Sequence, residues 1–408
     1  QQTQAISQAL TLAHPMVDVH ARYIHTLEHG GRLNRELEFL PGDEELGERR
    51  SDGKGLTAPE LAILLPYSKI TTYKDLLNSD APEDPYLSRE LERYFPTPSR
   101  ARFREQIHEH RLHREITATH VTNSLVNRCG PSFGFRIGEE TGAEAPDIAR
   151  AYTAAREIFS MRSLWDGIEA LDNRVEARLQ TRIMLDARKL VERATRWLLR
   201  NRRAPLDIGA TISHFSEGAA ELSELIPGIL LDGDREAVEN AAQRLIDANV
   251  PPDLAWRAAR LGPMFSSLDI TDVANATGES LDTTAAVYFT LGDRLKLHWL
   301  RRHIEALPRD NRWRTLARSA LRDDIFNQQA ALAAEVLRNT PEERDAHERI
   351  EAWVEANEGP VDRTLQVLAD INASGTFDLS TLSVALREIR NLVTAPEASP
   401  QEVEATAR

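Results

Sequence analysis

The chain has 408 residues, enough for two or three compact units, because a single hydrophobic core usually stops growing near ~250 residues. Its hydrophobic share of 41% and charged share of 28% are typical of a folded globular protein and exclude wholesale disorder. The formal net charge of -14 excludes a generally basic surface, so we expect no nucleic acid partner.

Cysteine content and hydropathy exclude further classes. Cys129 is the single cysteine, which excludes an internal disulfide or a multi-thiolate metal site, and we expect a cytoplasmic protein. The longest apolar stretches, such as residues 61–65, are far shorter than the ~20 residues that span a bilayer, so we expect no membrane segment. The chain begins Gln1-Gln2-Thr3-Gln4, with neither an initiator Met nor a signal-peptide pattern, so we expect it to be part of a longer polypeptide.

In chain order, the first expected element is an N-terminal helical segment that ends in a linker. Apolar residues recur at three- and four-residue spacings along the chain, which predicts an all-α fold built as a multi-helix array. Residues 41–55 are rich in Gly, Asp, Glu and Arg, a composition typical of an exposed linker. We therefore expect residues 1–55 to form a separate N-terminal segment.

A well-marked helix start follows at residues 57–60. Thr57 can cap free amides, Glu60 can reach back to complete a capping box, and Pro59 fits the first turn. The buried stripe of this helix is expected to consist of Leu61, Leu64 and Leu65.

Later boundaries fall where proline interrupts the helical pattern, because proline lacks the amide that a helix interior requires. These breaks lie at residues 96–98, 202–205, 249–252 and 340–341. We expect a first helical unit over residues 56–204, a second over 205–340, C-terminal helices over 341–394 and a flexible tail over 395–408.

An internal repeat is visible in the second and third quarters of the chain. Three matches, each separated by 136 residues, pair Thr141-Gly142 with Thr277-Gly278, Tyr152 with Tyr288, and Ile168-Glu169-Ala170-Leu171 with Ile304-Glu305-Ala306-Leu307. Each copy is expected to contain a helix ended by glycine, a helix anchored by tyrosine, and two further helices. We favour duplication into two similar helical units over convergent amphipathic patterning.

Patterns for cofactor or metal chemistry are weak. A dinucleotide-binding turn needs closely spaced glycines between a strand and a helix, and the nearest match, Gly53-Lys54-Gly55, lacks the third glycine, so we interpret it as a loop. His108, His110, His113 and His120 could share a metal, but no cysteine joins them, and we favour a solvated helix face. We assign no catalytic, cofactor-binding or metal-binding residue.

Two further patterns have structural interpretations. Cys129 precedes Gly130-Pro131, and we expect it to end a helix as a small buried residue and not to act as a nucleophile. Residues 273–288 have the outline of a DNA-binding helix-turn-helix. Because no Lys or Arg occurs between Glu279 and Asp293, we favour a packed helical hairpin.

The strongest electrostatic feature is the range 174–203, where ten Lys or Arg residues stand against three acids in an acidic chain. Either its arginines meet nearby carboxylates, which we favour, or they form an interaction face for an acidic partner. The candidate residues of this "basic face" are Arg174, Arg178, Arg182, Lys189, Arg193 and Arg200.

Several longer motifs carry a family resemblance. They are Leu37-Glu38-Phe39-Leu40-Pro41, Leu56-Thr57-Ala58-Pro59-Glu60-Leu61-Ala62-Ile63-Leu64-Leu65-Pro66-Tyr67-Ser68-Lys69, Asp84-Pro85-Tyr86-Leu87, Arg93-Tyr94-Phe95-Pro96, Glu139-Glu140-Thr141-Gly142, Ala149-Arg150-Ala151-Tyr152 and Val287-Tyr288-Phe289. With these motifs the chain resembles the large bacterial NAD-specific glutamate dehydrogenases. Pro66 and Ser68 depart from the usual pattern, which allows a kink or an early break in that helix.

The resemblance implies that this chain is the helical C-terminal region of a much longer polypeptide, after regulatory and catalytic domains. It implies that the whole enzyme converts L-glutamate to 2-oxoglutarate and ammonium with NAD as cofactor. The family's catalytic lysine and aspartate and its dinucleotide turn have no matching position here. We therefore expect a non-catalytic region for structure and assembly, whose partners are the rest of its own polypeptide and further copies in a homo-oligomer.

Two alternatives stay open. The chain could be an independent helical adaptor that binds an acidic partner through residues 174–203, or its helices could bind a small regulatory ligand such as an amino acid. Charge reversal in that range and ligand-induced thermal shifts discriminate between them.

Overall fold

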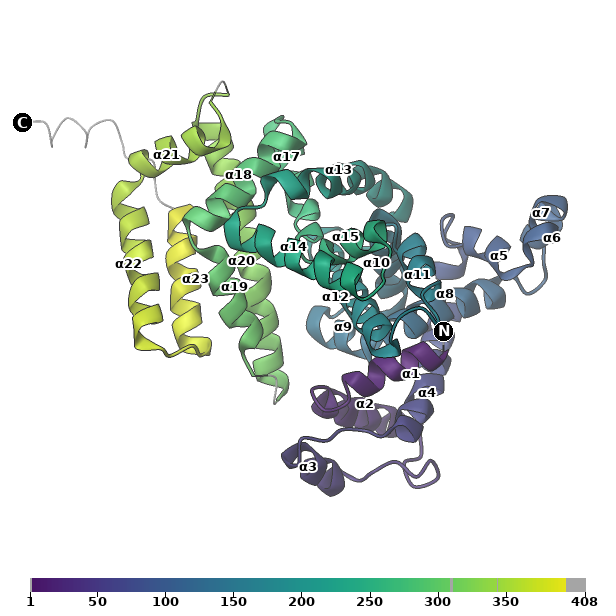
Figure 1. Ribbon diagram of the computed structural model, residues 1–408. Helices are drawn as coiled ribbons and strands as arrows, with labels where there is room; N and C mark the ends of the chain where they lie inside the picture. The colour runs from purple at the N-terminus through teal and green to yellow at the C-terminus, as the bar shows by residue number, and fades with distance from the viewer. Residues whose placement is uncertain (1, 309–310, 343, 394–408) are drawn as a thin grey trace, which may run out of the picture. The chain divides into compact units, whose positions relative to one another are not determined.

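The computed structural model describes residues 2–308, 311–342 and 344–393 (Figure 1). Within these ranges the protein consists of α-helices and one short 3-10 helix, with no strand, which confirms the all-α prediction. The expected flexible tail over 395–408 lies outside the described residues. None of the described helices combines the length and apolar character needed to cross a membrane.

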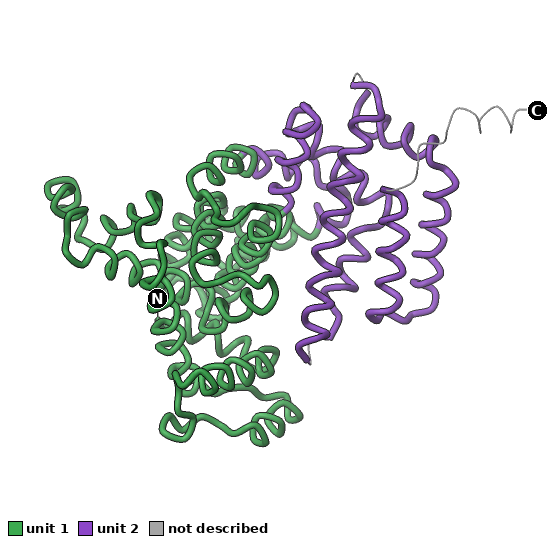
Figure 2. Tube along the Cα trace, turned by 180° about the vertical axis from the view of Figure 1, so that it is seen from behind, with its two compact units in different colours: residues 1–220, 237–265 green, residues 221–236, 266–408 purple. Residues whose placement is uncertain are grey.

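The chain divides into two compact units, coloured separately in Figure 2. Unit 1 comprises residues 1–220 and 237–265, and unit 2 comprises residues 221–236 and the described residues from 266 onward. Helices α13 (Ile208–Ile229) and α14 (Asp232–Asp247) each contribute to both units. The expected division into ranges 56–204 and 205–340 stays a prediction.

The other helices of unit 1 are mostly connected by short segments. They are α1 (Gln2–Thr11), α2 (Val17–His29), α3 (Asp43–Ser51), α4 (Ala58–Leu77), η1 (Ala81–Glu83), α5 (Arg89–Tyr94), α6 (Thr97–Arg102), α7 (Arg104–His108), α8 (His113–Cys129), α9 (Phe133–Thr141), α10 (Ala145–Ile158), α11 (Met161–Glu169), α12 (Ala177–Asn201), α15 (Pro252–Ala259) and α16 (Leu261–Met264). The proline-rich breaks at 96–98, 202–205 and 249–252 all fall at or beside helix ends, as predicted.

Helix α4 shows how local sequence signals fix a helix start. Thr57 and Glu60 form the predicted capping box, in which the Thr57 amide donates to Glu60 Oε2 at 2.7 Å. The predicted stripe of Leu61, Leu64 and Leu65 is buried, and Leu61 and Leu64 join the core formed with α1, α2 and α3. The helix continues past Pro66 to Leu77, so the early break that the sequence allowed does not occur.

The expected linker at residues 41–55 needs a correction. Much of it is exposed, but it contains helix α3, and the buried Leu46 of that helix belongs to the same core as Leu61. Arg49 of α3 also pairs with Glu60, at 2.7 Å between Nη1 and Oε2. The sequence did not predict this helix because Leu46 is its single buried residue, which gives no apolar periodicity.

Helix α10 forms the centre of unit 1. It packs against α4, α8, α9, α11 and α12 (Figure 1). The small residues Ala149, Ala151, Ala154 and Ala155 are completely buried along it, and Tyr152 is the large side chain at its middle. Small side chains let the surrounding helices approach closely, so this helix carries much of the interhelical contact.

Unit 2 is built around the long helix α20 (Arg312–Asn339), which packs against α17, α18, α19, α21 and α23. Its further helices are α17 (Ser267–Thr277), α18 (Leu281–Arg294), α19 (Leu297–Ala306), α20 (Arg312–Asn339), α21 (Ala346–Ala356), α22 (Glu358–Ser374) and α23 (Leu379–Val393). Helix α20 ends at Asn339, before the predicted break at Pro341. Helices α17 and α18 pack together as the hairpin that we favoured over a DNA-binding motif.

The predicted repeat pairs α9–α12, here named the first helical set, with α17–α20, the second helical set. Gly142 and Gly278 both end their helices with positive φ, and Tyr152 and Tyr288 are both completely buried. Ser160 and Lys296 are also 136 residues apart, and both precede a helix with positive φ, 49° and 56°. These correspondences agree with duplication, which stays a prediction until the two sets are superposed.

Candidate functional site

The predicted basic face lies along α12 and the turn before it. Within the helix its members follow one another at intervals of four, seven, four and seven residues, which places them on one side of an α-helix. They are Arg178, Arg182, Lys189, Arg193 and Arg200, with Arg174 in the preceding turn. The opposite side is apolar and buried and includes Leu190, Val191, Ala194 and Leu198.

The N-terminal half of the basic face is open to solvent. Arg174, Arg178 and Arg182 are exposed and form no ion pair within the part of the chain that the structure describes. Lys189 is also exposed and contacts Asp186 on its own helix, at 2.9 Å between Nζ and Oδ1. This half carries positive charge that unit 1 does not neutralise directly.

The C-terminal half of α12 lies against α9, which supplies carboxylates. Arg196 pairs with Glu140, and both side chains are about 95% buried. Arg200 donates from Nη2 to the backbone oxygen of Glu140 at 3.1 Å, and Arg193 is half-buried. The charge excess in this half therefore serves the packing of α12 on α9.

A second buried ion group lies beside it. Glu192 accepts from Arg136 at 2.5 Å and from Arg188 at 2.7 Å. Burial alone would raise the pKa of Glu192, but the two guanidinium groups outweigh it and lower the pKa to about 2. The nearby His20 is buried, and this burial, together with the positive charge of Arg188 and Arg136, lowers its pKa to about 3.

Sequence reasoning missed a charge group in unit 1 with a deeply buried centre, which we name the Glu90 cluster: Glu90, Arg156, Glu157 and Arg162. Glu90 Oε1 accepts from Arg156 Nη2 at 2.8 Å and from Arg162 Nη2 at 2.6 Å, and both arginines also reach Glu157. The side chains of Glu90 and Arg156 are 3% and 1% exposed. Glu90 is 66 residues from Arg156 in sequence, so no local sequence pattern predicts the pair.

Electrostatics hold the Glu90 carboxylate in its ionised form. Burial would raise the pKa of Glu90, but a contact from His120 Nε2 at 3.1 Å and the charges of Arg156 and Arg162 lower it well below its usual range. The two arginines therefore bind Oε1, and the His120 ring lies against Oε2. The cluster is a structural element that ties α5 to α10 and α11.

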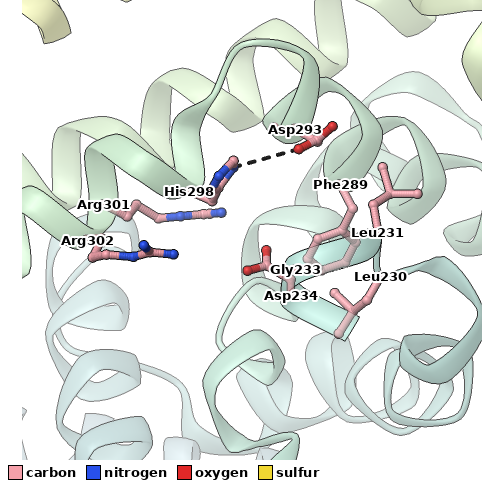
Figure 3. A pocket seen from close by; sticks show the side chains of 10 residues that line it. Leu230, Leu231, Gly233, Asp234, Phe289, Asp293, His298, Arg301 and Arg302 are labelled. Carbon is pink, nitrogen blue, oxygen red and sulfur yellow. Dashed lines mark ion pairs between the residues drawn. The ribbon is translucent and has the colours of Figure 1, made fainter. Parts of the chain in front are cut away.

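Unit 2 contains a small cavity of about 90 Å³ (Figure 3). His298, Arg301 and Arg302 of α19 stand on one side, and His298 Nδ1 lies 3.8 Å from Asp293 Oδ1. Arg301 is held by Gln329, to whose Oε1 it donates at 3.0 Å. The remaining lining residues are Leu230, Leu231, Gly233, Asp234, Phe289 and Gly292. The mixed charges suit a small polar molecule and provide no nucleophile with an adjacent base.

The remaining sequence candidates have structural roles. Cys129 ends α8 and is completely buried, as predicted, and this burial raises the pKa of its thiol. A Cβ on Gly55 would lie 2.2 Å from the Ala13 carbonyl, so this glycine permits close backbone packing. Gly55, in the nearest sequence match to a dinucleotide turn, therefore has a packing role in this loop.

The histidine group differs from its expected helix face. His108 ends α7, His113 begins α8, and His110 lies between the two helices, so these side chains do not share one helix. His108 instead contacts Glu92 at 2.7 Å, and His120 contacts the Glu90 cluster. The expectation of one helix face was wrong because α7 ends at His108 and a new helix, α8, begins only at His113.

Comparison with known proteins places the chain in a family. The family model described as "Glutamate dehydrogenase, C-terminal" matches residues 53–391. The chain belongs to this family. Among proteins named NAD-specific glutamate dehydrogenase, it is 39% identical to that of Halomonas elongata and 38% to that of Pseudomonas aeruginosa, each over 96% of the chain, and 37% to that of Mycobacterium tuberculosis over 92%.

The matches cover nearly all of this chain but only a small part of each relative. The chain spans about a quarter of their length, 24%, 24% and 23% respectively. The glutamate dehydrogenase C-terminal family thus describes one region of proteins that are about four times longer. The side chains of Glu140 and Tyr152, which lie in two of the motifs that carry the sequence resemblance, are both buried.

Proposed function

We propose that this chain is the C-terminal structural and assembly region of a cytoplasmic NAD-dependent glutamate dehydrogenase. The whole enzyme would oxidatively deaminate L-glutamate to 2-oxoglutarate and ammonium, with NAD bound outside this chain. The observation that carries the proposal is the match of 37–39% identity over nearly the whole chain to proteins of that name. The chain's own contribution is a helical body that supports the catalytic region and the contacts between copies.

The chemistry of the described residues supports a non-catalytic role. Hydride transfer to NAD needs backbone amides placed against a pyrophosphate, whereas Gly55, in the nearest sequence match to such a turn, packs against Ala13. The thiol of Cys129 is buried, and the carboxylates of Glu90 and Glu192 are held by arginines. These groups therefore stabilise packing and are not free to act as acids or bases.

The direct test compares this chain with the full-length polypeptide that contains it. We expect NADH formation, followed by absorbance, from the full-length protein with glutamate and NAD, and none from this chain. Light scattering of the full-length protein should give a mass of several copies. Glutamate oxidation by this chain alone would overturn the proposal.

A second candidate function rests on the exposed half of the basic face. Arg174, Arg178 and Arg182 are available to an acidic partner, which favours an adaptor role or an assembly contact. Replacing Arg178 and Arg182 with Glu should weaken whichever contact they make, whereas Lys54→Glu, at an exposed cation outside the basic face, should leave that contact unchanged. If neither assembly mass nor partner capture changes, the basic face is an ordinary solvated surface.

A further inference from the structure

The segment between α2 and α3 exposes two large apolar side chains. The Phe39 side chain is 90% exposed and that of Leu37 is 72% exposed. Single exposed hydrophobic residues are ordinary on protein surfaces, so exposure by itself indicates little. The backbone and the anchoring of this segment add independent information.

Phe39 adopts an unfavourable backbone conformation. Its φ is +52°, in the left-handed region that suits glycine and that aromatic residues rarely enter. The turn is closed by backbone hydrogen bonds from Phe39 to Glu36 at 3.2 Å and from Leu40 to Arg35 at 3.0 Å. Because the Phe39 ring is almost fully exposed, its packing within this chain does not offset the backbone strain.

The surrounding residues hold this turn firmly. Leu33 and Leu40 are buried in the core shared with α1, α2 and α4. Arg35 is paired with both Glu28 and Asp43 at 2.7 Å. Tyr67 of α4 donates to Glu38 Oε1 at 2.5 Å, between the two exposed side chains. The turn is therefore a preformed projection with Leu37 and Phe39 at its tip.

We propose that residues 37–39, the Leu37–Phe39 turn, dock into an apolar recess on the part of the same polypeptide that lies outside this chain. This inference rests on the proposed function, in which about three quarters of the polypeptide is elsewhere, as in the relatives. The turn belongs to the segment before residue 53, which the C-terminal family model leaves uncovered.

Contact area favours a partner in the same polypeptide over a separate molecule. Two side chains bury a few hundred Å² at most, whereas a stable complex between separate proteins needs roughly 1,200 Å² or more. A contact within one polypeptide needs less, because the connecting chain supplies an effective concentration in the millimolar range. The small, rigid Leu37–Phe39 turn suits this second case.

The test uses the full-length polypeptide with hydroxyl-radical footprinting read by mass spectrometry. We expect oxidation of Phe39 to be at least about tenfold slower in the native protein than in the denatured one, because docking excludes solvent from its ring. Oxidation of Phe39 at the denatured rate would overturn the proposal.

Two variants separate docking from folding. Phe39→Ala and Phe39→Gly both remove the ring, but glycine also relieves the left-handed backbone. Both should accelerate proteolytic release of the C-terminal region from the full-length polypeptide by at least about tenfold. Amide exchange in α2 and α4 should be no faster in Phe39→Gly than in the unchanged protein. Unchanged release rates for both variants would contradict the proposal.

Two other outcomes distinguish the partner of the turn from the function of the whole enzyme. A fall in assembly mass with unchanged release would show that a second copy receives the turn, and would overturn docking within one polypeptide. Glutamate oxidation by the full-length protein is measured separately. Failure of that activity with Phe39 still protected would reject the proposed function and leave the docking contact in place.

Discussion

The first and second helical sets have matching helix-ending glycines and buried tyrosines but differ in their polar interiors. Arg156, Glu157 and Arg162 of the first set belong to the closed Glu90 cluster. The residues 136 positions later are Gly292, Asp293 and His298, and all three line the cavity of unit 2. Matching apolar anchors and helix ends therefore accompany different polar interiors. The helix that packs against these positions decides whether they form an ion cluster or line a cavity. In the first set that partner is α5, which contributes Glu90.

The largest expected effect separates these two interiors. Glu90→Ala removes the more buried of the two carboxylates that Arg156 and Arg162 share, and losing one partner of a buried pair costs about 3–5 kcal/mol of unfolding free energy. Asp293→Asn is the matched change in the second set, where the partners are partly exposed, and should cost less than about 1 kcal/mol. Urea denaturation of both variants measures the contrast, and equal losses would refute it.

Acid should destabilise the region around the first helical set. Folded His20 has a pKa of about 3, whereas the unfolded chain takes up this proton near pH 6.5. The unfolded state therefore binds more protons below pH 6.5, and stability falls by roughly 1.4 kcal/mol per pH unit, or about 2 kcal/mol by pH 5. Hydrogen exchange should show α12 losing protection before α20. Replacing His20 with Asn should remove this part of the pH dependence; an unchanged slope would contradict the assignment.

Gly292 tests how tightly the interior of the second set is packed, because the substitution adds atoms there and does not remove them. An added Cβ would lie 2.6 Å from Gln329 Nε2, which donates to the Tyr288 backbone oxygen at 2.8 Å. We expect Gly292→Ala to cost about 1–2 kcal/mol through this displacement. The control is Gly134→Ala in α9, where a Cβ meets no atom within 4 Å and should stabilise by about 0.5–1 kcal/mol. Thermal unfolding of the two variants should therefore shift in opposite directions.

The smallest expected effect tests what the two sets share. Ser160→Gly and Lys296→Gly both relieve a positive φ, a gain of about 1–2 kcal/mol that glycine's extra unfolded-state entropy offsets by about 0.5–1 kcal/mol. Each variant should gain roughly 0.5 kcal/mol in denaturant unfolding. Ser163→Gly, within α11, should instead lose about 0.5–1 kcal/mol, because glycine is the poorer helix former and the hydroxyl's bonds to Ser160 and Arg257 are lost. Opposite signs at positions 160 and 296 would count against a common backbone plan.

Local signals in the sequence determined the helical class and many element boundaries. The capping box at Thr57, the proline breaks and the helix end at Cys129 each depend on residues within about one turn of one another. Such interactions form in the same way whatever packs around them, which is why they could be predicted. The longer motifs also identified the family before any contact was known.

Only the tertiary structure decided which charges are internal. Arg196 and Arg182 look alike in sequence, yet one is buried against Glu140 and the other is exposed. Glu90 meets Arg156 across 66 residues, and α3 survives in a charged stretch because Leu46 reaches a core formed by other helices. These outcomes depend on which distant segments pack together, because burial, and not residue type, makes an ionic contact strong or weak.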